Sequence, residues 1–291
     1  MGRKKPTARK SSSTAKCACL LALLCAAAFV CGGVLWWLSA RSPQIELPYL
    51  TARQVAVLDA DTGRFVCEMD ADVPHSPASL TKLMTVLLVL DDIEAGTLDW
   101  EDTYTVTLEE ANALGSKYGM RPGEVFTVRQ LVAGTVMVSG CDCVQCLVKL
   151  CAGNEAAFVR RMNGKAKELG MDGSNFANAT GIDAAGHYMT ARDVARLARA
   201  LVEDHPEILD FTSAPSLQIG ERTFKNIHRL VGFDPRVKGL KTGTTRIGGF
   251  NVCTYAEEDG HRYVIVLLDS SGDNTRFSET VDIMDALFGE S

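Results

Sequence analysis

The stretch Pro77-Ala78-Ser79-Leu80-Thr81-Lys82-Leu83-Met84-Thr85 leads into a run of residues that is apolar on nearly every side of a helix. Such a helix is expected to be buried, and Gly96 is a plausible end for it. Ser79 and Lys82 lie three residues apart, which places both on one face, one turn apart. A lysine inside so apolar a helix is hard to explain as a solvated charge. A partly desolvated amine there could be the base that a serine nucleophile needs.

The predicted position of Ser79 at the start of this helix adds to the hypothesis. Backbone N–H groups point outward at a helix N-terminus and favour a developing oxyanion. A serine and a lysine at this spacing recur by chance in most chains of this size, so the pair alone indicates little. The apolar context of the pair is what favours a catalytic interpretation.

A second informative stretch is Gly239-Leu240-Lys241-Thr242-Gly243-Thr244-Thr245. The apolar, β-branched run at 263–268 is expected to be a buried strand, joined to the strand before it by a hairpin at 257–260. Lys241 should lie on or beside the strand that leads into this hairpin. A cation and a hydroxyl there could hold a substrate carboxylate. Taken alone, Lys-Thr-Gly is more often an ordinary turn.

These motifs together resemble those of the D-alanyl-D-alanine carboxypeptidases, the low-molecular-weight penicillin-binding proteins of serine peptidase family S11. The similarity extends to Ala56-Val57-Leu58-Asp59-Ala60-Asp61-Thr62-Gly63 and to two middle segments, 175–183 and 187–193. It covers roughly residues 48–290. It implies an α+β fold in which an antiparallel β-sheet packs with a helical cluster, the β-lactamase/DD-peptidase-like transpeptidase fold. The order of predicted strands and helices agrees with this architecture.

The resemblance implies catalytic roles for three residues. Ser79 would be the nucleophile that forms the acyl-ester, and Lys82 would be its general base. The family's third motif is S-x-N, which corresponds here to Ser139-Gly140-Cys141. Ser139 matches the serine that relays a proton to the leaving group.

The resemblance also implies how the substrate is bound. Lys241 matches the residue that binds the terminal carboxylate, and Thr242, Gly243 and Thr244 complete this substrate-binding motif. The backbone N–H groups of Ser79 and Thr244 would form the oxyanion hole. The implied enzyme is a serine-type D-Ala-D-Ala carboxypeptidase that needs no cofactor. Its partners would be a peptidoglycan stem peptide as substrate and β-lactams as inhibitors.

Cys141 departs from the family pattern, which usually has Asn at this position. A thiol is a weak donor and a weak acceptor, so it replaces an amide poorly. We expect reduced or altered activity. Two alternatives remain open: a non-catalytic peptidoglycan-binding member, and a β-lactamase. A β-lactamase needs a deacylating glutamate, and Glu155 and Glu168 lack the sequence setting of that residue.

The cysteines and histidines give little support to a metal site or to another class of hydrolase. Four of the ten cysteines crowd into residues 141–151, but a helical segment of small apolar positions explains them better than a zinc site does. Cys67 and Cys253 are expected to be free thiols. The sequence contains neither H-E-x-x-H nor G-x-S-x-G. We expect His187 to make a structural hydrogen bond.

The N-terminal sequence predicts a membrane anchor. Residues 1–16 carry six basic side chains and no acid, and residues 17–38 are uncharged. These 22 residues would span roughly 33 Å as a helix, enough to cross a bilayer. The basic segment should remain in the cytoplasm of a bacterial cell. The domain would then be extracytoplasmic on a single-pass anchor in the cell membrane. A signal peptide cleaved after Ala40 is the alternative.

The predicted organisation is a basic segment (1–16), a transmembrane signal-anchor (17–38), a linker (39–53) and a DD-peptidase catalytic domain (54–291). Many relatives add a C-terminal β-rich domain and a tail helix, for which this chain has no expected counterpart. The formal net charge is −6. It becomes −12 when the six basic residues of the N-terminal segment are set aside, so nucleic acid is not an expected partner.

Overall fold

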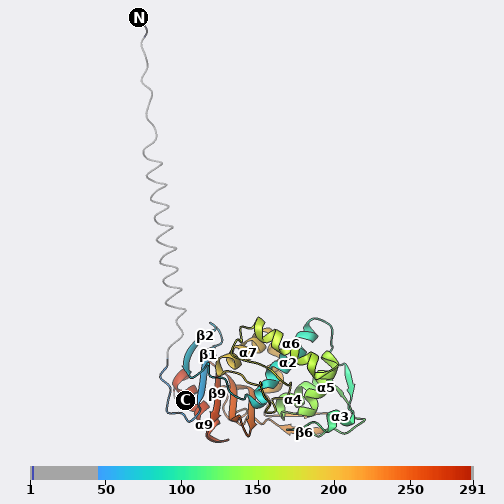
Figure 1. Cartoon of the computed structure of the whole chain (residues 1–291). Helices are drawn as coiled ribbons and strands as arrows, with labels where there is room; N and C mark the ends of the chain where they lie inside the picture. The colour runs from blue at the N-terminus through green and yellow to red at the C-terminus, as the bar shows by residue number, and fades with distance from the viewer. Residues whose placement is uncertain (1, 3–44, 290–291) are drawn as a thin grey trace. The chain divides into compact units, whose positions relative to one another are not determined.

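The computed structural model describes Gly2 and residues 45–289, and residues 45–289 form a domain built on an antiparallel sheet (Figure 1). Its five strands run in the order β2-β1-β9-β8-β7, and each neighbouring pair is antiparallel. The first strands of the domain therefore share a sheet with the last ones. The strands are β1 (Gln54–Asp59), β2 (Arg64–Met69), β7 (Val237–Thr245), β8 (Gly249–Glu258) and β9 (His261–Ser270).

Both faces of this sheet are covered, and residue alternation along β1 shows how. Ala56 and Leu58 belong to the core that the sheet shares with the helical cluster, whereas Val55 and Val57 pack in a second core with α9 (Thr275–Phe288). Successive side chains of a strand point to opposite faces. All six residues of β1 are consequently buried.

The helical cluster lies against the first face, and α2 packs there against α4, α5, α6 and α7 (Figure 1). Every residue of α2 from Lys82 to Leu90 is buried, as expected of a helix without a polar side. The helices before α9 are α2 (Lys82–Glu94), α3 (Leu108–Ala111), α4 (Val128–Met137), α5 (Cys141–Ala152), α6 (Glu155–Glu168), α7 (Ala191–Asp204) and α8 (Leu209–Thr212), with 3-10 turns η1 (Ala78–Thr81) and η2 (Pro206–Ile208).

Two small antiparallel hairpins lie outside the main sheet. Tyr118, which precedes β4, packs edge-on against Phe126 of one hairpin and its hydroxyl donates to the Ile219 carbonyl of the other (2.7 Å). The hairpins thereby brace the segment around Tyr118. Their strands are β3 (Thr103–Thr105) with β4 (Val125–Thr127), and β5 (Ser216–Ile219) with β6 (Arg222–Lys225).

The fold class predicted from the sequence is confirmed. The expected hairpin joins β8 to β9 through Asp259 and Gly260, which both have positive φ, as a two-residue turn of type I′ requires. The apolar helix ends at Glu94, and Gly96 follows with a φ of +70°, the left-handed conformation common after a helix end.

The predicted transmembrane segment, 17–38, lies outside the described residues. Among the helices that are described, none is long and apolar enough to cross a membrane. Residues 45–53 of the predicted linker pack against the domain: the Thr51 hydroxyl (2.6 Å) and the Ala52 N–H (3.3 Å) donate to the Glu279 carboxylate of α9. The domain boundaries stay a prediction.

Candidate active site

The predicted nucleophile, Ser79, lies in the 3-10 turn η1, and α2 begins three residues later, at Lys82. The sequence indicated one continuous helix. The turn is tighter because its backbone bonds span three residues: the Lys82 N–H donates to the Ser79 carbonyl, and the Leu80 N–H donates to the Pro77 carbonyl (3.2 Å). Ala78, where the turn begins, has a φ of +50°, and its carbonyl accepts the Thr81 hydroxyl (2.8 Å). Three residues per turn bring positions i and i+3 into line. Lys82 Nζ accordingly lies 3.0 Å from Ser79 Oγ.

Lys82 is almost completely enclosed, with 1% of its surface exposed. Its Nζ donates a hydrogen bond to the Thr180 carbonyl at 2.6 Å. Burial lowers the pKa of Lys82 because the ammonium form loses its hydration, and the neighbouring Cys141 opposes this shift. A lysine with a lowered pKa beside a hydroxyl has the chemistry of a general base.

Ser139 closes the site from the turn between α4 and α5. Its φ is +58°, which is uncommon for a residue other than glycine. Its Oγ is buried and has no hydrogen-bond partner within the described part of the chain. A buried hydroxyl without a partner is costly, so this group is available to a substrate.

Cys141 is the first residue of α5, and its N–H donates to the Ser116 carbonyl (2.7 Å). The side chain is buried, and its Sγ lies 3.9 Å from the Ser139 carbonyl oxygen. A Cβ added to Gly115 would come within 2.9 Å of this sulfur. The thiol therefore lies in a narrow space beside Lys82.

Strand β7 carries the Lys-Thr-Gly motif along the edge of the sheet. Lys241 is 1% exposed, and its Nζ donates to the Thr242 carbonyl (2.9 Å). Burial, followed by the charges of Lys82 and Arg276, holds the pKa of Lys241 well below its usual value. Gly243 allows a close approach, because a Cβ there would lie 2.8 Å from the Pro77 carbonyl oxygen.

Arg276 joins the site from the first turn of α9, and no sequence pattern predicted it. Its Nη1 donates to the Gly243 carbonyl (3.0 Å), the Thr244 hydroxyl (3.0 Å) and the Asn251 carbonyl (2.9 Å). Its Nη2 forms an ion pair with Asp273 at 2.5 Å. An isolated arginine in a polar segment gives no sequence signal, because its proximity to β7 depends on how α9 packs on the sheet.

A cleft of about 330 Å³ brings most of these groups together. Lys82 and Lys241 are enclosed behind its wall, close enough to each other for their charges to interact. The residues that line the cleft are Ser79, Ser116, Ser139, Asn226, Ile227, Arg229, Thr242, Thr244, Asp273 and Arg276.

Comparison with known proteins identifies the family of this chain. The family model of the S11 peptidases, described as D-alanyl-D-alanine carboxypeptidase, matches residues 41–272. The chain belongs to the S11 peptidase family. It is 31% identical to the D-alanyl-D-alanine carboxypeptidase DacF of Bacillus subtilis over 244 residues, which are 82% of this chain and 62% of DacF. It is 32% identical to DacC of Escherichia coli over 253 residues, which are 84% of this chain and 63% of DacC.

The chain thus spans about three-fifths of the length of these two curated relatives. Two solved structures are also similar to this chain. Penicillin-binding protein D2 of Listeria monocytogenes, in its ampicillin-bound form, is 30% identical with a TM-score of 0.74, and the match covers 84% of this chain and 99% of that one. DacD of Francisella tularensis is 28% identical with a TM-score of 0.78, covering 84% and 71%.

A buried carboxylate of this S11 domain, Asp142, supports the site from behind. It accepts the successive backbone N–H groups of Tyr118 (2.9 Å), Gly119 (2.8 Å) and Met120 (3.2 Å). These contacts fix the segment that carries Ser116. The role of Asp142 was not predicted, because a carboxylate that accepts backbone N–H groups leaves no motif.

His187 makes structural hydrogen bonds, as predicted. Its Nδ1 accepts the Ala177 N–H (3.0 Å), so its Nε2 carries the proton that faces the Thr81 hydroxyl (2.8 Å). Burial lowers the pKa of His187 to about 4. The ring is therefore neutral near pH 7.

The cysteines of α5 behave as small core residues. Cys143 lies against Gly134 and Gly140, and Cys146 Sγ lies 3.9 Å from the Met120 sulfur. Burial raises the pKa of both thiols. All six cysteines in the described ranges are free, and Cys253 is buried whereas Cys67 is only partly so.

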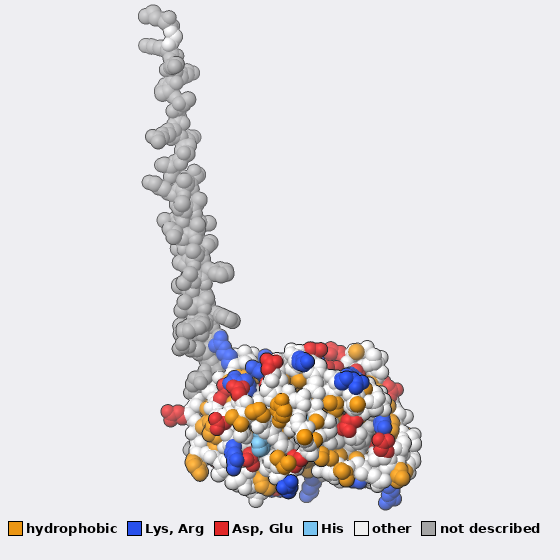
Figure 2. Space-filling view, in the orientation of Figure 1, with side chains coloured by type: hydrophobic (Ala, Val, Ile, Leu, Met, Phe, Trp, Pro, Cys, Tyr) orange, Lys and Arg blue, Asp and Glu red, His pale blue; other side chains and the backbone are white. Residues whose placement is uncertain are grey.

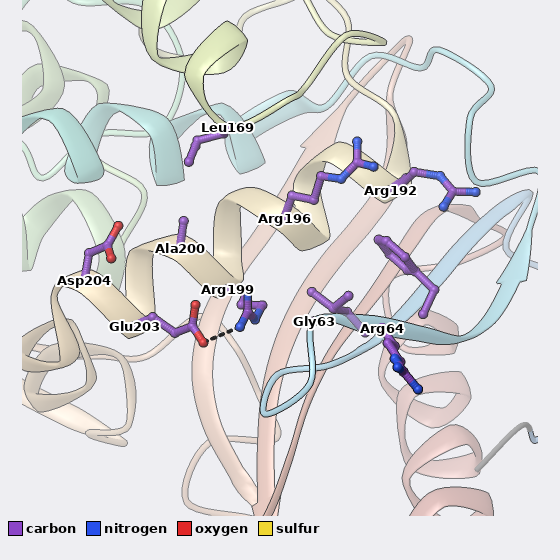
Figure 3. A pocket seen from close by; sticks show the side chains of 11 residues that line it. Gly63, Arg64, Leu169, Arg192, Arg196, Arg199, Ala200, Glu203 and Asp204 are labelled. Atoms are coloured by element: carbon purple, nitrogen blue, oxygen red, sulfur yellow. Dashed lines mark ion pairs between the residues drawn. The ribbon is translucent and has the colours of Figure 1, made fainter. Parts of the chain in front are cut away.

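A larger hollow of about 730 Å³ lies along α7 (Figure 3). Arg192, Arg196 and Arg199 line it, and each forms an ion pair with a carboxylate within 3.2 Å. Among the described residues that form it, there is no group from the predicted site. On the face of the domain in Figure 2, acidic and basic side chains are likewise interspersed. The described lining of this hollow supplies no nucleophile, so the chemistry belongs to the smaller cleft.

Proposed function

We propose that this protein is a serine-type D-Ala-D-Ala carboxypeptidase that removes the terminal D-Ala from peptidoglycan stem peptides and is acylated by β-lactams. The observation that carries the proposal is the 3.0 Å separation of Lys82 Nζ and Ser79 Oγ beside the Ser139 hydroxyl. Family membership and relatives named as D-alanyl-D-alanine carboxypeptidases support it. A relative with bound ampicillin supports the β-lactam part.

Acylation begins with Lys82 in its neutral form, which its lowered pKa favours. Lys82 accepts the Ser79 proton while Ser79 Oγ bonds to the carbonyl carbon of the penultimate D-Ala. The negative charge that develops on the carbonyl oxygen is stabilised by the backbone N–H groups of Ser79 and Thr244. The peptide C–N bond then breaks, and the leaving amine takes a proton from Lys82 through Ser139. Water finally hydrolyses the acyl-ester.

The terminal carboxylate of the substrate is held on the β7 side of the cleft. Thr242 and Thr244 supply hydroxyls there, and Arg276 supplies a guanidinium already ordered by β7. The Lys241 amine lies behind this wall, and a carboxylate bound in front of it favours the protonated form of the amine. Capture of the carboxylate by these local cations fits a domain whose overall charge is negative.

The test is intact-mass spectrometry of the full chain after incubation with benzylpenicillin, with Ser79→Ala as the control. A lasting adduct that is absent from the variant supports the proposal, and D-Ala release from a blocked L-Lys-D-Ala-D-Ala peptide completes it. A folded protein that neither forms an adduct nor consumes penicillin would be a non-catalytic peptidoglycan-binding protein. Rapid consumption without an adduct would indicate a β-lactamase.

We also propose that the protein is held in the cell membrane by residues 17–38, with its catalytic domain outside the cytoplasm of a bacterium. The basic flank at 1–16 and the 22 uncharged residues after it support this. Intact cells treated with a protease that cannot cross the membrane should lose the domain. Protection of the domain in intact cells, or recovery in the supernatant of a chain starting near residue 41, would contradict the anchored topology.

A further inference from the structure

The part of the cleft next to Arg276 is bordered by an ion pair between two loops. Arg229 lies in the segment before β7, and its guanidinium pairs with the Asp273 carboxylate. It also donates to the Asn274 side chain in the same turn between β9 and α9. Arg229 and Asp273 both line the cleft, and Arg229 has no part in the proposed acylation steps.

Both loops are held firmly where they meet. On one side, the Asn226 side chain donates to the Thr212 carbonyl (2.9 Å), and the Ile227 N–H donates to the Met137 carbonyl (3.2 Å). On the other side, Asp273 also pairs with Arg276 at 2.5 Å. The Arg229–Asp273 pair therefore joins two anchored segments, and we call it the crossbar.

This crossbar lies next to the groups that would hold the terminal carboxylate. Arg276 reaches the Thr244 hydroxyl with Nη1 and Asp273 with Nη2, so a single guanidinium separates the carboxylate site from the crossbar. A cleft of about 330 Å³ is at the small end of ligand-binding pockets. A residue added beyond the terminal D-Ala would have to pass through Arg229 and Asp273.

We propose that the Arg229–Asp273 pair restricts the leaving group to a single residue that ends in a free carboxylate. This inference rests on the proposed function. The pair makes the enzyme an exopeptidase by blocking the cleft, and the Asp273 carboxylate repels an acidic group displaced by one residue. Opening the crossbar admits a longer leaving group without altering Ser79, Lys82 or Ser139.

The Arg229–Asp273 pair is exposed to solvent, and an exposed ion pair contributes little to stability. Its effect on specificity depends instead on its position beside the cleft. The side chains of Arg229 and Asp273 are 55% and 37% exposed. Arg262 and Asp61 form a matched pair, 47% and 34% exposed, between β9 and the β1–β2 turn. Loss of the Arg262 pair removes the same kind of interaction at a place that does not border the cleft.

The experiment compares two blocked peptides as substrates of the full chain, one ending in L-Lys-D-Ala-D-Ala and one ending in L-Lys-D-Ala-D-Ala-Gly. Cleavage after the penultimate D-Ala of the first releases D-Ala, and cleavage of the same bond in the second releases D-Ala-Gly. The variants are Arg229→Ala, Arg229→Lys and the control Arg262→Ala. Each peptide has one free carboxylate. A change in the overall electrostatic attraction of the protein for a carboxylate therefore affects both peptides alike and cancels in the ratio of their kcat/KM values.

We expect the wild type and Arg262→Ala to favour the shorter peptide by at least about 100-fold, and Arg229→Ala to reduce this ratio at least tenfold. Arg229→Lys should lie between, because a lysine keeps the charge but pairs at one point. The Arg229→Lys variant also provides the test if Arg229→Ala fails to fold. An equal rate on both peptides in the wild type, or an unchanged ratio in both Arg229 variants, overturns the inference alone. No D-Ala release from the shorter peptide by the wild type overturns the proposed function together with it.

Discussion

Replacing Gly243 by alanine tests the close approach of β7 to the nucleophile turn. A Cβ at this position would lie 2.8 Å from the Pro77 carbonyl oxygen and 3.1 Å from both the Ala78 Cβ and the Ser79 nitrogen. The first distance is shorter than real Cβ contacts, and its partner is backbone. Strand β7 and the turn η1 must therefore move apart by several tenths of an ångström.

This movement has a calculable effect on the proposed oxyanion hole, because one donor lies on each of the two segments that separate. Loss of one such donor costs about 100- to 1000-fold in rate, or roughly 3–4 kcal/mol. We expect acylation of Gly243→Ala by benzylpenicillin to be about 100-fold slower. Forcing a methyl group into a packed position also costs about 1–3 kcal/mol of stability, so the variant should still fold.

The assay follows adduct formation by intact mass over time and measures unfolding in urea. Gly164→Ala is the matched control, since no heavy atom lies within 4 Å of the added Cβ in α6. That variant should be acylated at the wild-type rate and gain roughly 0.5–1 kcal/mol of stability. Wild-type acylation by Gly243→Ala would refute the argument that β7 and Ser79 must meet at this distance.

Three further changes have distinct expected outcomes. Cys141→Asn should increase D-Ala release, because an amide can form strong hydrogen bonds to both substrate and lysine whereas a thiol bonds only weakly; equal or slower release would show that the thiol is no handicap. Asp142→Asn should lower the free energy of unfolding in urea by about 2–3 kcal/mol, because the amide NH₂ cannot accept N–H bonds, and an unchanged midpoint would contradict this. His187 has a pKa of about 4 in the folded domain, against an ordinary histidine value of 6.5, so its protonation favours the unfolded chain. Stability should fall as pH decreases from 6.5 to 4, by up to about 3 kcal/mol from this group, and His187→Gln should show a smaller loss when urea melts are compared across that range.

Local sequence patterns were sufficient to predict those helices and strands whose residues satisfy a single physical requirement. A helix apolar on all sides must be buried, which predicted α2, and a β-branched run next to Asp-Gly predicted the β8–β9 hairpin. The spacing of Ser79 and Lys82 predicted that their side chains meet, and the apolar residues around them favoured a catalytic role. Both a helix and a 3-10 turn satisfy that spacing, so the sequence could not distinguish them.

Contacts between distant segments explain what could not be predicted. Arg276 reaches β7 only because α9 packs on one face of a sheet whose strands come from both ends of the domain. The partners of Asp142 are backbone N–H groups, which nearly every residue carries, so the sequence does not indicate which of them the carboxylate binds. The crossbar from Arg229 to Asp273 joins residues 44 positions apart, and neither residue belongs to a motif.

The strand order β2-β1-β9-β8-β7 also has a consequence during biosynthesis. A chain that emerges from the ribosome N-terminus first carries Ser79 and Lys82 long before β9, the partner of β1, has been made. Strand β7, which completes the site around Ser79, is likewise synthesised late. A nascent chain therefore lacks a working site until nearly all of the domain has been translated. Each β-lactam adduct would then mark one finished molecule, and labelling would count completed proteins while leaving unfinished ones untouched.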